Sequence, residues 1–154
     1  MTRIPVSPPL RRLVAARAGY HCEYCLLAEQ DTTVRHTIDH IIAVKHGGPT
    51  AADNLALACV ECNANKGSDI ATLDPEGGEL VPLFNPRLDI WEEHFAFDGA
   101  IIVGLTPIGR GTVRMLQFNE PIHLQRRARL TSTPKGLRIS VLRRLMSRTR
   151  STTA

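Results

Sequence analysis

Apolar and basic residues recur at helical spacing near the start of the chain, in the stretch LRRLVAARAG over residues 10–19. Leu10 and Val14 contribute to an apolar stripe, and the arginines between them form a basic face. Ser7 can cap a helix here, and the two prolines that follow it are tolerated in a first turn. Because Gly19 is a helix-ending residue, we expect a capped helix between Ser7 and Gly19.

The next patterned segment, residues 32–39 (TTVRHTID), is rich in β-branched side chains. We expect this segment to end in a strand that delivers Asp39 and His40. Residues 41–54 contain a Gly-Gly-Pro break, so we expect a loop with a short turn near its end. The apolar run LALAC follows this loop, and a helix should then start near residue 63 and end by residue 67.

Turn signals alternate with short apolar groups in the second half of the chain. Residues 74–78 (DPEGG) predict a turn. The dipeptide Asp98-Gly99 predicts a β-hairpin. In that hairpin we expect two phenylalanines to face two β-branched residues, namely Phe95 and Phe97 opposite Ile101 and Val103.

Helices are expected to complete the chain. Thr106 before Pro107 is typical of a capped helix start, and residues 121–130 predict a further, basic helix. Residues 138–150 (RISVLRRLMSRTR) have the pattern of a basic amphipathic helix. The chain length of 154 residues is that of one domain, which we place at residues 1–130, with a motif core over 20–70, an extension over 80–130 and a basic tail over 131–154.

The composition limits the class of protein. Hydrophobic residues make up 43% and aromatic residues 5% of the chain, so the core should be mainly aliphatic. No apolar run approaches the ~20 residues that cross a bilayer, and no apolar segment follows the basic start. We therefore expect a cytoplasmic protein, in whose reducing surroundings four cysteines are metal ligands or thiols rather than disulfides.

The charge is distributed unevenly. Residues 1–19 hold four arginines and residues 121–154 hold nine Lys/Arg, in both cases without an acidic residue. All 15 acidic residues lie in between, among six Lys/Arg. Basic ends suit a polyanion such as DNA, and an acidic middle suits cations. The alternative is that the basic ends are merely solvated, and charge alone leaves both open.

The cysteines form two Cys-x-x-Cys pairs, Cys22/Cys25 and Cys59/Cys62. Each two-residue gap lets one turn present two sulfur atoms to one ion, and four thiolates suit tetrahedral zinc at ~2.3 Å. Because four thiolates fill the coordination sphere, this zinc would be structural. It would fasten both ends of the loop between the pairs and add folding energy that a small core lacks.

The dipeptide Asp39-His40 lies between the two cysteine pairs. A carboxylate is a hard ligand suited to Mg²⁺ or Mn²⁺, and an imidazole titrates near neutral pH. Phosphodiester hydrolysis requires both functions, because a base activates water and a cation neutralises the developing charge. An isolated Asp-His pair is usually a surface turn, but its position between the cysteine pairs favours a site.

The ordered pattern resembles the zinc-stapled, four-cysteine branch of the HNH endonuclease family. The residues that carry the resemblance are Cys22-x-x-Cys25, Asp39-His40-Ile41-Ile42, Gly47-Gly48, Asn54-Leu55 and Cys59-x-x-Cys62-Asn63-x-x-Lys66. It implies an α+β fold, with a ββα-metal core stapled by the four-cysteine zinc site. An N-terminal helix and a C-terminal extension of a hairpin and helices would flank this core.

The resemblance also implies roles for individual residues. His40 matches the general base, Asp39 the metal ligand beside it, and Asn54 the residue that holds the loop and orients the base. Asn63 occupies the third motif position, where many members have a metal-binding histidine, so the chain is an H-N-N variant. An amide oxygen there favours Mg²⁺ or Mn²⁺ over softer metals. Ala43 stands where many members have proline.

Two further residues are candidates for contact with phosphate. His46 adjoins Gly47-Gly48, where a histidine is more often simply exposed. Lys66 lies one helical turn beyond Asn63 and could pair with a phosphate or with Asp39.

Three functions are compatible with the sequence. The first is a metal-dependent endonuclease that acts on DNA, for which duplex is the simpler expectation because no aromatic residues lie among the basic ones. The second is a zinc-stabilised DNA-binding module without hydrolysis, and the third a zinc scaffold for protein partners. Sequence preference, strand number cut, biological role and oligomeric state have no signal in the sequence.

Overall fold

The computed structural model describes residues 5–131. Its helices and strands form a mixed α+β fold, as predicted. In chain order they are α1 (Pro8–Arg17), η1 (Glu29–Asp31), β1 (Thr37–His40), η2 (Val44–His46), η3 (Ala52–Asn54), β2 (Leu55–Ala58), α2 (Val60–Lys66), β3 (Ala71–Leu73), β4 (Leu80–Pro82), α3 (Trp91–His94), β5 (Phe95–Asp98), β6 (Ile101–Gly104), α4 (Pro107–Met115) and α5 (Pro121–Thr131), where η marks a 3₁₀-helix.

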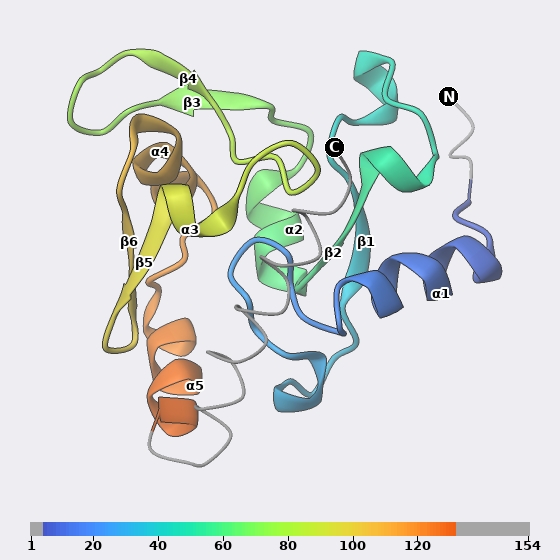
Figure 1. The fold of residues 1–154 in the computed structure, drawn as a ribbon, viewed down its shortest axis with the longest axis horizontal. Coiled ribbons are helices and arrows are strands. Elements are labelled where there is room, and N and C mark those ends of the chain that lie inside the picture. Colours follow the sequence, from blue (N-terminus) through green and yellow to red (C-terminus); the bar gives the residue numbers. More distant parts are fainter. Residues whose placement is uncertain (1–4, 132–154) are drawn as a thin grey trace.

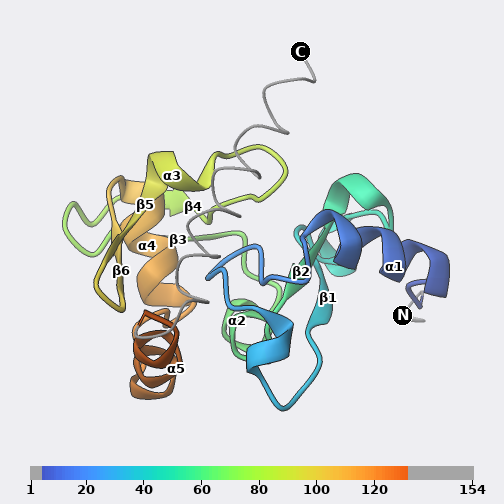
Figure 2. The same ribbon diagram turned by 60° about the horizontal axis from the view of Figure 1, so that its bottom comes forward.

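Helix α2 stands between two groups of elements. Figures 1 and 2 show α1 and the strand pair β1–β2 on one side of it, and β5, β6 and α4 on the other. Three separate two-stranded antiparallel sheets, β1–β2, β3–β4 and β5–β6, make up the strands of the described residues. The predicted tail over 131–154, including the basic amphipathic helix over 138–150, lies outside the described residues apart from Thr131, which ends α5.

The predicted N-terminal helix is confirmed as α1. The Ser7 hydroxyl accepts a hydrogen bond from the Leu10 amide at 3.4 Å, and two prolines occupy the first turn. The apolar side of α1 buries Val14 against β2, in a small core cluster with Leu55 and Leu57. Its basic side is also used within the fold, because Arg17 donates to the carbonyls of Ala52 and Leu55 at 2.8 and 2.6 Å. Helix α1 therefore supports the loop before β2.

The β-rich segment ends in strand β1, as predicted, and this strand begins at Thr37. The side chain of Glu29 accepts a hydrogen bond from the His36 amide at 2.8 Å, and the Glu29 carbonyl accepts one from the Thr32 hydroxyl. These bonds hold residues 32–36 as a turn despite their β-branched composition. The strand still delivers Asp39 and His40, which pair with Ala56 and Leu55 of β2.

Helix α2 begins at Val60, three residues before the expected start. Cys59 caps it, since its sulfur atom accepts a hydrogen bond from the Cys62 amide at 3.4 Å. The second cysteine pair is thus itself the first turn of the helix. The predicted end by Gly67 is correct.

The hairpin β5–β6 is confirmed, but its expected register is wrong by one residue. Phe95 pairs with Gly104 and Phe97 with Ile102, because a two-residue loop sets Asp98 opposite Ile101. Gly99 in that loop has φ +58°. The predicted turn over 74–78 lies between β3 and β4, two short strands that the sequence did not predict.

One core cluster joins the motif core to the extension. It contains all four cysteines together with aromatic side chains of the extension, among them Trp91, Phe95 and Phe118. The Trp91 ring donates to the Tyr24 carbonyl at 2.8 Å. The extension therefore packs directly on the first cysteine pair, and its aromatic residues supply the bulk that the motif core lacks. No helix in the described part of the chain has the length and apolar character needed to cross a membrane.

Candidate active site and metal centre

The four cysteines meet in one buried cluster. Their sulfur atoms all lie within 4.8 Å of one another. The first pair comes from the turn after α1 and the second from the start of α2. Each of the four residues is at most 2% exposed.

The cluster fits a tetrahedral zinc ion in both size and chemistry. Zinc–sulfur bonds of about 2.3 Å in a tetrahedron place neighbouring sulfur atoms about 3.8 Å apart. The sulfur atoms of Cys25 and Cys59 are 3.8 Å apart. Hydrogen bonds with the sulfur atoms of Cys22, Cys25 and Cys59, together with burial, raise the pKa of the Cys62 thiol. A bound cation would reverse this by favouring the thiolates, so zinc binding should release protons.

His40 lies at the end of β1, half-buried, and its imidazole is held by Thr50. The Nε2 atom of the ring and the Thr50 hydroxyl oxygen are 2.9 Å apart. When Nε2 carries the proton and donates to Thr50, the lone pair of the ring is on Nδ1. This contact fixes the orientation of the imidazole.

Asn54 holds the loop between His40 and β2 closed. Its side-chain oxygen accepts from the Ile42 amide at 3.0 Å, and its side-chain nitrogen donates to the carbonyls of Ile42 and Pro49, each at 2.9 Å. The loop must approach the backbone closely at Gly48. A Cβ atom there would clash with the Ile42 carbonyl and lie 2.8 Å from the Asn54 side-chain nitrogen. Thr50 directly follows Pro49, so the bond from Asn54 to the Pro49 carbonyl also positions the partner of His40.

Asp39 is buried and engaged by two side chains. The Tyr24 hydroxyl donates to one carboxylate oxygen at 2.6 Å, and the Lys66 ammonium lies 3.1 Å from that oxygen and 3.3 Å from the other. Lys66 also donates to the His40 carbonyl at 3.1 Å. These contacts fasten α2 to the end of β1. Of the two partners expected for Lys66, the structure has Asp39, and the lysine side chain is only 2% exposed.

Burial dominates the electrostatics of this group. It raises the pKa of Asp39, and the opposing effects of the Lys66 ammonium and the Tyr24 hydroxyl only partly offset it. Burial, followed by the negative charge of Asp39, raises the pKa of Tyr24 well above its ordinary value. Tyr24 is therefore a hydrogen-bond donor to the carboxylate over the whole physiological range.

A catalytic cation would need Asp39 and Asn63, whose carboxylate and amide oxygens suit Mg²⁺ or Mn²⁺. The donor chemistry fits such an ion. The two oxygens of Asp39, however, already interact with Lys66 and Tyr24. Asn63 is half-buried on α2, and no hydrogen bond between the described residues joins its side chain to Asp39. A cation at Asp39 would therefore compete with the Lys66 ammonium.

The remaining predicted residues lie apart from this group. His46 is exposed in η2, so its contact with phosphate stays a prediction.

Some arginines of the two basic ends make contacts within the protein. Arg17 donates to the loop beside α1, Arg126 pairs with Glu61 at 2.7 Å, and Arg127 is 6% exposed. Much of the remaining basic charge falls at residues 135–150, outside the described part of the chain.

Three functional contacts were missed from the sequence: those of Tyr24, Thr50 and Arg17. Tyr24 lies between Cys22 and Cys25, where only a turn was expected. A residue between two ligands of one ion lies in the same buried turn as these ligands. The spacing of the two cysteines could therefore have indicated that Tyr24 faces the core. The contacts of Thr50 and Arg17 join segments 10 and 38 residues apart, for which the sequence has no periodic signal.

The comparison with protein families agrees with this geometry. Residues 22–69 match the family model described as HNH endonuclease. The matched segment begins at the first cysteine and includes β1, β2 and α2. No curated protein and no solved structure matches the chain. Residues 22–69 are thus an HNH endonuclease segment by similarity to that family, whose substrates are nucleic acids, and the buried four-cysteine cluster is consistent with the zinc-stapled form of the family.

Proposed function

We propose that the protein is a metal-dependent DNA endonuclease in which His40 is the general base. The observation that supports this most strongly is the imidazole of His40 held against the Thr50 hydroxyl at 2.9 Å. Such a bond orients the ring, and when Nε2 is the donor to Thr50, the lone pair on Nδ1 can accept a proton from water. The HNH match of residues 22–69 supports a phosphodiester substrate.

In the proposed reaction, Nδ1 of His40 takes a proton from a water molecule as its oxygen attacks phosphorus. The opposite phosphorus–oxygen bond breaks, and the leaving oxygen takes a proton from solvent. Asn54 keeps Thr50 and His40 in register through its three backbone hydrogen bonds. Lys66 and Asp39 hold the end of β1, from which His40 projects.

Two cations belong to this proposal. Zinc held by Cys22, Cys25, Cys59 and Cys62 would be structural. Mg²⁺ or Mn²⁺ held by Asp39 and Asn63 would supply charge stabilisation to the phosphate and the leaving oxygen when bound. The substrate we expect is duplex DNA, gripped through its phosphates by exposed basic side chains such as Arg12 and by Lys45.

The test is nicking of supercoiled plasmid DNA with Mg²⁺ or Mn²⁺. We expect His40→Ala to abolish cleavage while the zinc content and thermal midpoint stay at wild-type values. Thr50→Val should slow cleavage by roughly fivefold, since one ring hydrogen bond of about 1 kcal/mol is lost. Thr33→Val, at an exposed threonine in the segment between η1 and β1, is the matched control. Cleavage by His40→Ala at the wild-type rate would refute the assignment.

A second candidate is a zinc-stabilised DNA-binding module without hydrolysis. The observation that favours it is the carboxylate of Asp39, which is already neutralised by Lys66. This function predicts salt-sensitive DNA binding and no nicking with any divalent cation. The plasmid assay and a gel shift on the same preparation separate the two functions.

A further inference from the structure

The turn of the first cysteine pair is held from the extension by two contacts. Arg87 forms an ion pair with the Glu23 carboxylate, and the ring nitrogen of Trp91 donates to the Tyr24 carbonyl at 2.8 Å. Both donors lie outside the segment that matches the family model, residues 22–69, and both acceptors lie within it. The extension therefore fixes the backbone of this turn.

The two residues that receive these contacts each bond to one strand of the pair β1–β2. The amide of Glu23 donates to the Leu57 carbonyl, and its carboxylate accepts from the Leu57 amide, each at 2.8 Å. These bonds lie on β2, whose other edge pairs with β1. The hydroxyl of Tyr24 reaches β1, where it donates to Oδ2 of Asp39 at 2.6 Å. A turn placed by the extension thus contacts both strands of the candidate active site.

The two oxygens of the Asp39 carboxylate are not equally engaged. Oδ2 accepts the Tyr24 hydroxyl and also lies 3.1 Å from the Lys66 ammonium. Oδ1 has only the Lys66 ammonium as a partner among the described residues, at the longer distance of 3.3 Å. A hydrogen bond to one oxygen of a carboxylate fixes its rotation and leaves the other oxygen for a metal ion. Oδ1 is therefore the better placed of the two to bind a divalent cation.

We propose that Tyr24 is a positioning residue for the catalytic cation, and that the extension sets its position through Trp91. Trp91 fixes the backbone of Tyr24, the Tyr24 hydroxyl holds Oδ2 of Asp39, and Oδ1 is left for Mg²⁺ or Mn²⁺. The inference rests on the proposed function, because it assumes a divalent ion at Asp39. It gives the extension a role in the metal dependence of cleavage.

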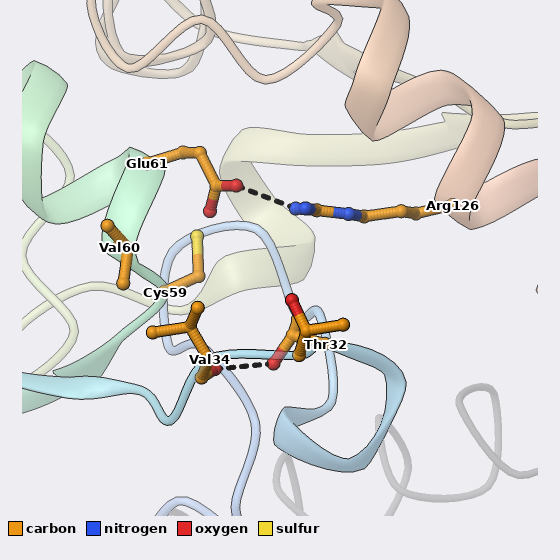
Figure 3. Close-up of a pocket in the computed structure, with 7 residues that line it drawn as sticks. Thr32, Val34, Cys59, Val60, Glu61 and Arg126 are labelled. Carbon is orange, nitrogen blue, oxygen red and sulfur yellow. Dashed lines mark hydrogen bonds and ion pairs between the residues drawn. The ribbon is translucent and has the colours of Figure 1, made fainter.

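A second contact between the extension and the motif core supplies a control. Figure 3 shows Arg126 of α5 bonded to Glu61 of α2, at 2.7 Å, beside a pocket that Cys59 also lines. Within residues 5–131, no hydrogen bond or ion pair joins either Arg126 or Glu61 to Asp39. Loss of this contact should loosen the extension at the second cysteine pair and leave the Asp39 carboxylate as it is.

The experiment measures Mn²⁺ binding to zinc-loaded, full-length protein without DNA, through the EPR signal of free Mn²⁺. We expect Tyr24→Phe to weaken Mn²⁺ binding by roughly tenfold, the lower end of the usual effect of losing a hydrogen bond to a metal ligand. Trp91→Phe keeps an aromatic ring and removes the N–H donor, so it should weaken binding by roughly threefold. Tyr20→Phe, at an exposed tyrosine, and Glu61→Gln are the controls, and both should stay within about twofold of wild type.

The metal dependence of plasmid nicking separates positioning from a structural role. In Tyr24→Phe the Mn²⁺ concentration for half-maximal nicking should rise by the same factor as the dissociation constant, while the rate at saturating Mn²⁺ stays near that of the wild type. A structural role would instead lower the thermal midpoint and leave Mn²⁺ binding unchanged. If Tyr24→Phe fails to fold, the Mn²⁺ affinity of Trp91→Phe decides the question.

Two results would overturn the proposal without touching the assignment of His40. Wild-type Mn²⁺ affinity in folded Tyr24→Phe would refute the positioning role, and wild-type affinity in Trp91→Phe would refute the role of the extension. A wild-type protein that neither bound Mn²⁺ nor nicked plasmid would refute the proposed function itself, which is a different outcome.

Discussion

The two candidate metal positions of this protein differ in what already neutralises them. At Asp39 the charge of the carboxylate is met by Lys66 at 3.1 Å and by the Tyr24 hydroxyl. At the cysteine cluster four acidic thiol groups share one buried space. The first position is stable with the protein's own cation, whereas the second is stable only with protons or a metal.

This difference assigns separate roles to the two positions. A cluster that has no adequate internal counter-charge couples metal binding to folding, because the metal supplies what the chain does not. A carboxylate that is already paired can exchange one cation for another without unfolding. We therefore expect zinc to be retained permanently and the divalent ion at Asp39 to bind in competition with Lys66.

Removal of zinc should have the largest effect. Cys62→Ala leaves three sulfur ligands, and a structural zinc site contributes roughly 10–16 kcal/mol, as much as the whole free energy of unfolding of a typical domain. We expect loss of bound zinc and of cooperative thermal unfolding, measured by metal analysis and circular dichroism. A cooperative transition at the wild-type midpoint, with zinc shown to be absent, would contradict a structural role.

Loss of Lys66 should have the next largest effect. Lys66→Met leaves Asp39 buried without its cation, since both side chains are at most 4% exposed, and should cost about 3–5 kcal/mol in denaturant unfolding. Mg²⁺ should then raise the thermal midpoint of Lys66→Met more than that of the wild type.

The matched control for this prediction is the double variant Lys66→Met with Asp39→Asn. It removes both charges, so we expect a smaller loss of stability and no additional effect of Mg²⁺. An equal response to Mg²⁺ in the wild type, the single variant and the double variant would show that Lys66 and the cation do not compete for Asp39.

A substitution at Gly48 should have a smaller effect on stability and a clear one on cleavage. A methyl group there clashes with the Ile42 carbonyl and displaces the Asn54 amide, so Gly48→Ala should cost about 1–3 kcal/mol in lost hydrogen bonds. Because His40 and Thr50 would move apart, plasmid nicking should slow on the order of 100-fold.

Gly47→Asn offers the comparison for Gly48. Gly47 has φ +88° and nothing near its Cβ position, and asparagine tolerates such backbone. We expect near-wild-type stability and nicking. Equal losses in the two variants would mean that backbone freedom, and not the close approach to Asn54, explains the paired glycines.

The sequence predicted the cysteine pairs and the helix caps better than it predicted the contacts between side chains. Regular spacing identified both cysteine pairs, and turn chemistry identified the caps at Ser7 and Thr106, because these signals depend only on neighbouring residues. The β-rich segment ends in β1 as predicted, and its earlier residues stay outside the strand because the Glu29 side chain accepts a hydrogen bond from the His36 amide, a contact that overrides β propensity.

Contacts between distant segments could not be predicted in this way. The contacts of Thr50 with His40 and of Tyr24 with Asp39 depend on how loops and helices pack in three dimensions. The strands β3 and β4 were missed because each has three residues and few of them are buried. Lys66 is the intermediate case, since its helical spacing from Asn63 suggested two partners and packing selected Asp39.

The most direct test of the account combines two measurements on the same preparations, zinc content and the initial rate of Mg²⁺- or Mn²⁺-dependent plasmid nicking. We predict one zinc per chain in both the wild type and His40→Ala, with nicking only in the wild type. Nicking by His40→Ala at the wild-type rate, with zinc fully bound, would contradict the assignment of His40 as the base.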